Sequence, residues 1–377
     1  MKCEGFIARK LINLSDIQMF ADNEGNSKLA AQELNAIADA ESSAPSEPSS
    51  YVPSGLESDL ANLHLQDDSD TSFFSIRSSA AFQNGKGSFA SRDIQRGDLI
   101  LSEKPIFIVP TNAPESLRRT YIEAAVRNLS PANLDSYLSL QNSHDKCSCF
   151  FSPLLGIFGT NAFAMSDSGG ICFRGARFNH SCSPNARFTF NSRTGKLRIY
   201  ALGTIRRGEE IFVGYVDYGL IGRRLYASPR QMRQAVLRTR YHFICACSVC
   251  SLPEAESKIS DTRRQKINEL WETIRSSDPR TQGVQNLNII VQAMRLRQEE
   301  GYLADADDFT NEAAPTCAFH SDWLSSSYWA GLTYHTRVAE FGEDSPQAAE
   351  VRQQYLNPRT FRSAGLGPPM DLTRFRV

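Results

Sequence analysis

Three cysteines lie within one turn-sized stretch of this chain, Cys245-Ala246-Cys247-Ser248-Val249-Cys250. Zinc prefers four tetrahedral ligands, and sites made of cysteine thiolates alone are common. The run therefore predicts a metal site that lacks one ligand, which another segment has to supply. The candidates for that ligand are Cys182, His242, Cys172 and Cys147. Buried or incidental cysteines that bind no metal are the alternative interpretation.

The amino terminus and the cysteine content indicate a reducing compartment. Glu4, Arg9 and Lys10 interrupt the apolar core that a signal peptide needs, and Asp16 and Asp22 are unlike a mitochondrial presequence. No apolar run approaches the roughly 20 residues of a membrane span. We therefore expect an intracellular protein of the nucleus and/or cytoplasm with no membrane partner, whose nine cysteines serve thiol or metal chemistry.

Charge gives little support to nucleic-acid binding. The chain has 41 basic and 42 acidic residues, a net charge of −1, whereas a protein that binds nucleic acid through its overall field is usually basic. One basic stretch, from Arg206 to Arg240, holds eight arginines against three acidic residues. A solvated helix face or a surface for an acidic partner explains it equally well. We expect no direct nucleic-acid binding.

Residues 1–70 differ from the rest of the chain, with 13 acidic against 4 basic residues and a Ser-, Pro- and Glu-rich stretch at 41–59. This composition predicts a mostly disordered acidic tail in which 27–40 is the one candidate helix.

Secondary-structure signals begin near residue 72. Short strand-like runs come first, and strand signals recur at 156–164, 171–178, 186–190 and 196–201. The last two runs are joined by N-S-R-T-G, which predicts a hairpin. The spacing of apolar residues predicts helices at 114–141, with a second helix opening at Pro131, and further helices at 229–241, 261–300 and 315–356.

Two further motifs are dense in polar and aromatic side chains. Arg177-Phe178-Asn179-His180-Ser181-Cys182-Ser183-Pro184-Asn185 crowds together groups that need partners if they are buried. Gly208-Glu209-Glu210-Ile211-Phe212-Val213-Gly214-Tyr215 reads as a turn and a strand that ends on a tyrosine. Taken singly, a packed histidine and a packed tyrosine explain them.

Together and in this order, these motifs resemble the SET-domain protein lysine methyltransferases. The matching segments are G-K-G-S-F-A at 85–90, R-F-N-H-S-C-S-P-N at 177–185, G-E-E-I-F-V-G-Y at 208–215 and F-I-C-A-C-S-V-C at 243–250, with T-N-A-F at 160–163 in support. The chain is most similar to the branch that carries a MYND zinc finger and a helical carboxyl-terminal domain. The 111–170 region offers only His144, Cys147 and Cys149, too few ligands for that finger, so we expect it to be absent.

The resemblance implies an α+β SET fold of several small β-sheets with a pseudoknot. It divides the chain into the tail at 1–70, a SET domain at 72–218 with a helical insert at about 111–160, a zinc-binding post-SET segment at 219–255 and a helical region at 256–377. Two cofactors are implied, S-adenosylmethionine and Zn²⁺, and the partner is a protein substrate bearing a lysine.

The resemblance also assigns roles to residues. Backbone contacts around the Gly-x-Gly turn, Asn179 and His180, a further contact at Asn161, and stacking by Phe243 hold S-adenosylmethionine, while Cys182 completes the zinc site and Tyr215 is catalytic. The implied cofactor set is Gly85, Lys86, Gly87, Ser88, Asn161, Asn179, His180, Tyr215 and Phe243, and the implied metal set is Cys182, Cys245, Cys247 and Cys250. Tyr218 is a further candidate for the lysine channel, with ordinary packing as its alternative.

The sequence is therefore compatible with three functions. The first is an active protein-lysine methyltransferase. The second is an inactive SET-fold zinc protein that serves as a protein-interaction module. The third is a zinc protein that binds nucleic acid.

Overall fold

A computed structural model describes residues 73–79, 85–144, 152–216 and 225–377. The predicted tail at 1–70 and the candidate helix at 27–40 lie outside these residues, as do Cys147, Cys149 and Tyr218.

The described strands form four small sheets rather than one large one. β1 pairs antiparallel with β2, β9 lies between β3 and β8, β6 lies between β4 and β5, and β7 pairs in parallel with β10. Their bounds are β1 Phe74–Ser78, β2 Lys86–Ala90, β3 Leu99–Glu103, β4 Phe107–Pro110, β5 Phe163–Met165, β6 Ser168–Ile171, β7 Asn179–His180, β8 Ala186–Asn191, β9 Lys196–Ala201 and β10 Phe212–Val213.

The predicted hairpin at 186–201 is confirmed as β8 and β9. Asn191 closes the turn, because its side-chain oxygen accepts the backbone N–H groups of Arg193 and Thr194, each at 3.1 Å. Gly195 then takes a φ of 65°, which favours glycine.

The insert after β4 is helical, as predicted, and contains α4 (Glu115–Arg127), α5 (Pro131–Leu138) and α6 (Pro153–Asn161). Ser130 caps α5 by accepting the N–H of Asn133. The strand predicted at 156–164 is wrong over most of its length. Ser152 caps a helix there by accepting the N–H of Leu154, and Pro153 at the first helical position completes a start signal that outweighs the apolar run.

The strand predicted at 171–178 is also wrong, because β6 ends at Ile171 and residues Gly175–Arg177 form a 3₁₀ turn. The carboxylate of Glu103 accepts the N–H groups of Arg174 and Gly175 at 3.1 and 2.9 Å. These donors are therefore taken by a side chain rather than by a neighbouring strand.

The remaining elements are mostly helical. The predicted helix at 229–241 is α7, and the run predicted at 261–300 is split at Ser277-Asp278, where Asp278 caps the next helix. The bounds are α7 Arg230–Tyr241, α8 Glu254–Ser276, α9 Pro279–Glu300, α10 Asp307–Phe319, α11 Trp323–Phe341 and α12 Pro346–Leu356, with 3₁₀ turns at Leu225–Ala227, Pro358–Thr360 and Thr373–Phe375. Among the described helices, none has both the length and the apolarity to cross a lipid bilayer.

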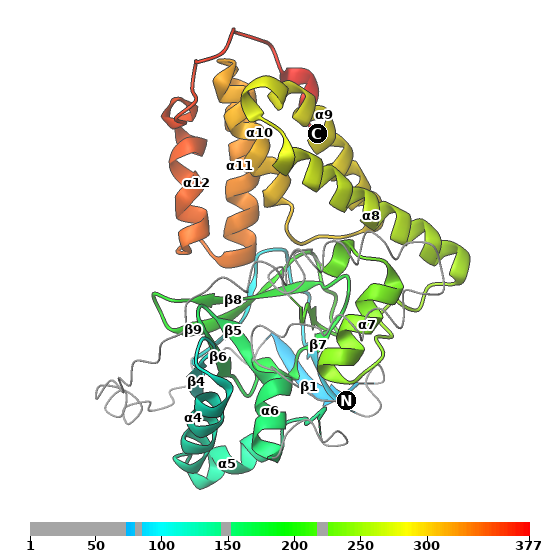
Figure 1. Cartoon of the computed structure of the whole chain (residues 1–377), viewed down its shortest axis with the longest axis vertical. Coiled ribbons are helices and arrows are strands. Elements are labelled where there is room, and N and C mark those ends of the chain that lie inside the picture. Colours follow the sequence, from blue (N-terminus) through cyan, green and yellow to red (C-terminus); the bar gives the residue numbers. More distant parts are fainter. Residues whose placement is uncertain (1–72, 80–84, 145–151, 217–224) are drawn as a thin grey trace.

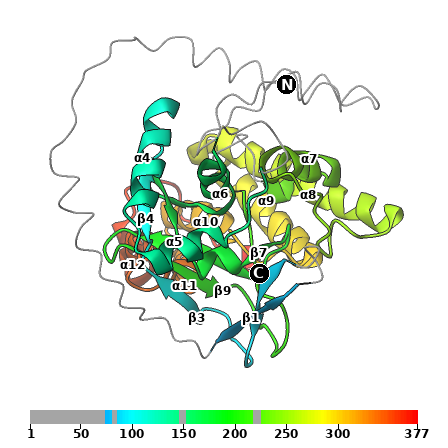
Figure 2. The same ribbon diagram turned by 90° about the horizontal axis from the view of Figure 1, so that it is seen from below.

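Helices cover the sheets from two sides. Figure 1 shows α8 to α12 above the sheets and α4 to α6 below them, and Figure 2 views the molecule from the side of α4 to α6. Helix α11 contacts β8 and β9. The core of the carboxyl-terminal helices, which contains the fully buried Trp329, also takes in Leu202 and Tyr226 from outside these helices. The core of the helical region thus extends to residues that lie beyond its helices, next to the sheets.

A buried acidic group crosses this junction. Glu340 on α11 is fully buried and accepts a 2.9 Å hydrogen bond from Arg187 on β8, which also pairs with Asp305. Burial raises the pKa of Glu340 to about 7, even though Arg187 opposes this shift.

We predict that this carboxyl makes the stability of the fold depend on pH. The folded protein holds the Glu340 proton more tightly than the unfolded chain does. The stability that comes from this protonated carboxyl is therefore complete below about pH 4.5 and is lost as the pH rises through 7. The free energy of unfolding of Glu340→Gln, measured relative to that of wild type, should therefore rise by about 3 kcal/mol between pH 4.5 and pH 7.5. Urea unfolding at both pH values measures this, with the exposed Glu343→Gln as control. An equal wild-type–variant difference at the two pH values would contradict the prediction.

Candidate functional site

The site is built where β7 and β10 pair in parallel, with Asn179 opposite Phe212 and His180 opposite Val213. The pairing continues into a 3.1 Å hydrogen bond from the Ser181 N–H to the Val213 carbonyl. Two motifs about thirty residues apart in the sequence are thereby placed side by side. The pseudoknot expected at this crossing stays a prediction.

The structure brings together the sulfur atoms of Cys182, Cys245, Cys247 and Cys250, all within 4.8 Å of one another. The Sγ of Cys182 lies 3.9 Å from that of Cys245 and 3.6 Å from that of Cys250. Four sulfurs bound tetrahedrally at about 2.3 Å from a zinc ion would be about 3.8 Å apart. A disulfide would need about 2.05 Å, so the spacing fits a metal rather than a covalent pair.

The two other candidates for the fourth ligand that the structure describes lie elsewhere. Cys172 is buried beside Phe163 and Leu197, and His242 is exposed at the end of α7 with its ring 4.7 Å from that of His144.

The charges of four such close sulfurs oppose one another. Hydrogen bonds from Cys182 and Cys245 lower the pKa of Cys250, and bonds from Cys182, Cys245 and Cys250 lower that of Cys247, while the same contacts raise the pKa of Cys182. In the absence of a cation the cluster therefore keeps protons on some sulfurs, because neighbouring thiolates repel. A divalent cation would allow all four to ionise.

His180 connects the sulfur cluster to Tyr215. Its Nδ1 accepts the backbone N–H of Tyr215 at 3.0 Å, which leaves the ring proton on Nε2, 3.4 Å from the Sγ of Cys182. Burial lowers the pKa of His180 to about 4, so the ring is neutral near neutral pH. The position of Cys182 thus helps to set the backbone of Tyr215.

Tyr215 directs its hydroxyl back toward the start of Asn179–Cys182, the NHSC segment, and donates a 3.1 Å hydrogen bond to the carbonyl of the residue before it, Phe178. Burial is the main cause of its raised pKa, with Tyr241 and Glu210 adding to it. The phenol therefore stays protonated, with its proton committed to Phe178 and its oxygen able to accept a hydrogen bond.

Other aromatic rings surround Tyr215. The ring centroids of His180, Tyr241 and Phe243 lie 5.3, 5.2 and 6.4 Å from that of Tyr215. The Tyr241 hydroxyl donates to the Tyr215 carbonyl at 3.0 Å. Both backbone polar groups of Tyr215 are therefore held by side chains.

Asn179 joins the start of β2 to the rest of the site. Its Nδ2 donates to the Lys86 carbonyl at 3.1 Å and to the Glu210 carboxylate at 2.7 Å, and Ser79 donates to the other Glu210 oxygen at 2.8 Å. A Cβ at Gly87 would overlap Glu210 and come within 2.9 Å of the Asn179 Nδ2. Gly87 is thus required by the close approach of this pair.

Comparison with known proteins assigns this framework. Residues 85–216 match the family described as the SET domain. This chain therefore contains a SET domain at these residues. It is similar to the histone-lysine N-methyltransferase set5 of Schizosaccharomyces pombe, with 29% identity over 294 residues that cover 76% of this chain and 86% of that protein.

Two other similarities are more limited. The protein-lysine N-trimethyltransferase SMYD5 of Danio rerio is 36% identical over 91 residues, which cover 24% of this chain and 21% of that protein, so this chain matches about a fifth of that relative's length. The solved SET domain of LSMT bound to lysine and AdoHcy is 12% identical, covers 77% of this chain and 89% of that one, and has a TM-score of 0.30. The predicted resemblance to SET proteins, including the SMYD group, is confirmed.

Some residues implied as cofactor contacts lie in several places around the SET domain. Ser88 is buried in β2 and donates to the Arg177 carbonyl, while Gly85 directly precedes β2 and Lys86 begins it. Asn161 ends α6, and its Nδ2 donates to the Gln141 and Ile157 carbonyls, each at 2.7 Å. Those two bonds occupy the Asn161 amide nitrogen and leave its amide oxygen as the group available to a ligand.

The sequence reasoning missed two members of the site, Glu210 and Tyr241. Glu210 lay within a quoted motif but was given no role, because its function depends on contacts to Ser79 and Asn179 across the fold. Tyr241 had a usable signal, since it lies two residues before Phe243 and close to the cysteine run.

We predict that Gly87→Ala destabilises the SET domain by about 1–3 kcal/mol, because the added methyl forces the Glu210 carboxylate away from Asn179. The matched control is Gly214→Ala, since no atom lies within 4 Å of a Cβ placed there. Urea unfolding of both variants measures the difference. Equal free energies of unfolding for the two variants would show that the contact between Gly87 and Glu210 does not constrain this part of β2.

Proposed function

We propose that this chain transfers the methyl group of S-adenosylmethionine to a lysine side chain of a protein substrate. The carrying observation is the setting of Tyr215, whose phenol proton is held by the Phe178 carbonyl while aromatic rings surround it. The SET-domain match and the relatives named as lysine methyltransferases support the same reaction.

Four elements would hold the cofactor. The backbone from Gly85 to Ser88, at the start of β2, is kept close to Asn179 by the hydrogen bond from the Asn179 Nδ2 to the Lys86 carbonyl. Phe243 is partly exposed beside His180 and offers a face on which an adenine can stack. Asn161 would add a contact through its amide oxygen. When bound, the sulfonium supplies an electrophilic methyl group.

The protein's own contribution is to orient a neutral amine. A free lysine has a pKa of about 10.4 and is mostly protonated near pH 7, but an apolar aromatic surround disfavours the charged form. Because its pKa is raised, Tyr215 stays a protonated phenol and offers no phenolate to act as a base. Its oxygen instead accepts an N–H of the substrate amine, which aligns the nitrogen lone pair for in-line attack on the methyl.

We infer that Zn²⁺ occupies the four-cysteine cluster, in keeping with sulfur spacings of 3.6 and 3.9 Å. Its role is structural, because four thiolates complete a tetrahedron and leave no position for substrate. It would fix the NHSC segment to the post-SET loop.

The carboxyl-terminal helices contribute to the surface that a substrate protein meets. A cavity of about 340 Å³ is bordered by Gly214 and Val216 next to Tyr215 and by Trp271 and Tyr302 from the helical region. We propose an intracellular protein substrate in the nucleus and/or cytoplasm, with no membrane partner and no direct role in binding nucleic acid.

The alternative, an inactive interaction module, is not favoured by the relatives, which are named as methyltransferases. Calorimetry with S-adenosylmethionine separates the two functions, because an interaction module has no need of saturable cofactor binding. Absence of such binding would remove the enzyme proposal.

We predict that Tyr215→Phe reduces methyl transfer by roughly 100- to 1000-fold, since it removes the oxygen that orients the amine. Transfer of radiolabelled methyl groups to proteins of a cell extract measures the effect. Tyr334→Phe on α11 makes the same chemical change at a tyrosine that stacks on Tyr355, and should label as wild type does. A Tyr215→Phe protein that labels equally well would refute the assigned role.

We also predict one zinc ion per chain by elemental analysis, lost largely in Cys247→Ser and retained in Cys317→Ser. Cys317 is a suitable control because it is buried in α10, outside the cluster. A full equivalent of zinc in Cys247→Ser would contradict the site.

A further inference from the structure

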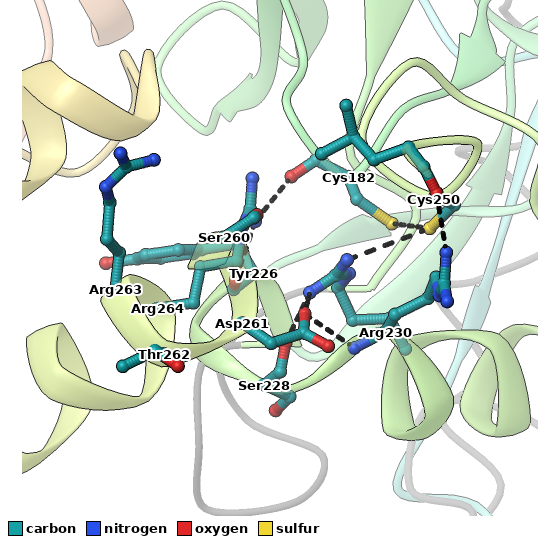
Figure 3. Close-up of polar contacts among 12 residues, drawn as sticks. Cys182, Tyr226, Ser228, Arg230, Cys250, Ser260, Asp261, Thr262, Arg263 and Arg264 are labelled. Carbon is teal, nitrogen blue, oxygen red and sulfur yellow. Dashed lines mark hydrogen bonds and ion pairs between the residues drawn. The ribbon is translucent and has the colours of Figure 1, made fainter. Parts of the chain in front are cut away.

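Helix α8 reaches from the carboxyl-terminal region to the cysteine cluster through Arg264, whose side chain is fully buried. One guanidinium nitrogen donates to the carbonyls of Cys182 and Tyr226 at 3.1 and 2.7 Å (Figure 3). The other donates to the Ser183 hydroxyl at 2.7 Å. The Nε donates to Glu300 on α9 at 2.7 Å. All three nitrogens of the side chain are therefore used.

These contacts matter because Cys182 is the distant member of the cluster, 63 residues from Cys245. Three sulfurs lie on one short loop, whereas Cys182 has to be held in place by its own surroundings. Arg264 donates hydrogen bonds both to the Cys182 carbonyl and to the side chain of the next residue, Ser183. A planar guanidinium can serve several acceptors at once, which a lysine ammonium does with a different geometry.

A second buried arginine, Arg233 on α7, also lies beside the cluster. Its Nη2 is 4.0 Å from the Sγ of Cys250, and its Nη1 donates to the Ser228 carbonyl at 2.5 Å and to the Asp261 carboxylate at 3.1 Å. Asp261 belongs to α8 and also accepts the backbone N–H of Arg230 at 2.8 Å. Helix α8 therefore holds this arginine as well.

The charges are complementary. Four thiolates around a divalent zinc ion leave a net charge of −2, and a buried guanidinium is costly unless anions lie close to it. Asp261 is partly exposed, with 21% of its side chain accessible, whereas Arg233 is wholly enclosed. The sulfur cluster is the other anionic neighbour of Arg233 in this setting.

We propose that α8 is part of the metal site, with Arg264 as the residue that positions Cys182 and Asp261 as the residue that positions Arg233 beside Cys250. This inference rests on the proposed zinc site. It makes the helical region a determinant of how tightly the post-SET loop is held.

The test uses the full chain and measures zinc transfer to a colorimetric chelator. Arg264→Lys keeps a charge near Glu300 but loses the planar set of donors, and zinc release should become about 10- to 100-fold faster. Arg263→Lys is the matched control, because Arg263 is the preceding residue on α8, is partly exposed and forms its ion pairs, within the part of the chain that the structure describes, with Glu299 and Glu300 on α9. Its release should match wild type.

A cobalt-substituted protein gives a second readout. Thiolate-to-cobalt absorption should fall in Arg264→Lys toward the level of Cys182→Ser, since both changes disturb the same ligand. If circular dichroism shows that Arg264→Lys does not fold, Asp261→Asn takes its place, because Asp261 is partly exposed and the change keeps its volume. Faster zinc release is expected there too.

The outcomes separate the two levels of the proposal. A wild-type chain that retains zinc, with release unchanged in both Arg264→Lys and Asp261→Asn, overturns the role of α8 alone. A wild-type chain that binds no zinc overturns the metal site and this inference together, and leaves the test of cofactor binding by calorimetry unaffected.

Discussion

The rest of the site depends on the contact between the sulfur of Cys182 and the sulfurs of the loop Cys245–Cys250. Cys182 follows His180 by two residues, so fixing its sulfur also fixes the imidazole that accepts the Tyr215 N–H. The Tyr241 hydroxyl holds the other side of the same peptide through the Tyr215 carbonyl. The sulfur cluster thereby helps to set where Tyr215 lies, because hydrogen bonds transmit the position of one group to the next.

Local signals predicted much of the fold. The hairpin of β8 and β9 and the helix after Pro131 follow from turn and capping residues within a few positions. The strand predicted at 156–164 was wrong because an apolar run does not distinguish a buried helix from a buried strand, and the cap at Ser152 decided it. The error at 171–178 has another cause. Glu103, some seventy residues away, takes the N–H groups of Arg174 and Gly175, and no local pattern contains that contact.

The site divides in the same way. The cysteine spacing alone predicted three metal ligands, but it left four candidates for the fourth, and only the resemblance to SET proteins selected Cys182. The structure places Cys182 at the cluster and His242 at an exposed helix end. The sequence motifs did not predict Glu210 and Tyr241 as members of the site, because each acts through a neighbour. Glu210 orients Asn179, and Tyr241 holds Tyr215. Such roles are properties of the folded arrangement, and a motif records them only where a family is already known.

The position of α8 changes the meaning of the boundary predicted at residue 256. That boundary follows the change from mixed structure to helices, yet Arg264 just beyond it bonds to the Cys182 carbonyl, and Leu202 and Tyr226 lie in the core of the helical region. A chain cut there would expose these apolar groups and leave the Cys182 and Tyr226 carbonyls and the Ser183 hydroxyl without their buried donor. The SET domain and the helical region are therefore separate in sequence pattern but not in packing. The polar groups that hold the NHSC segment come from both.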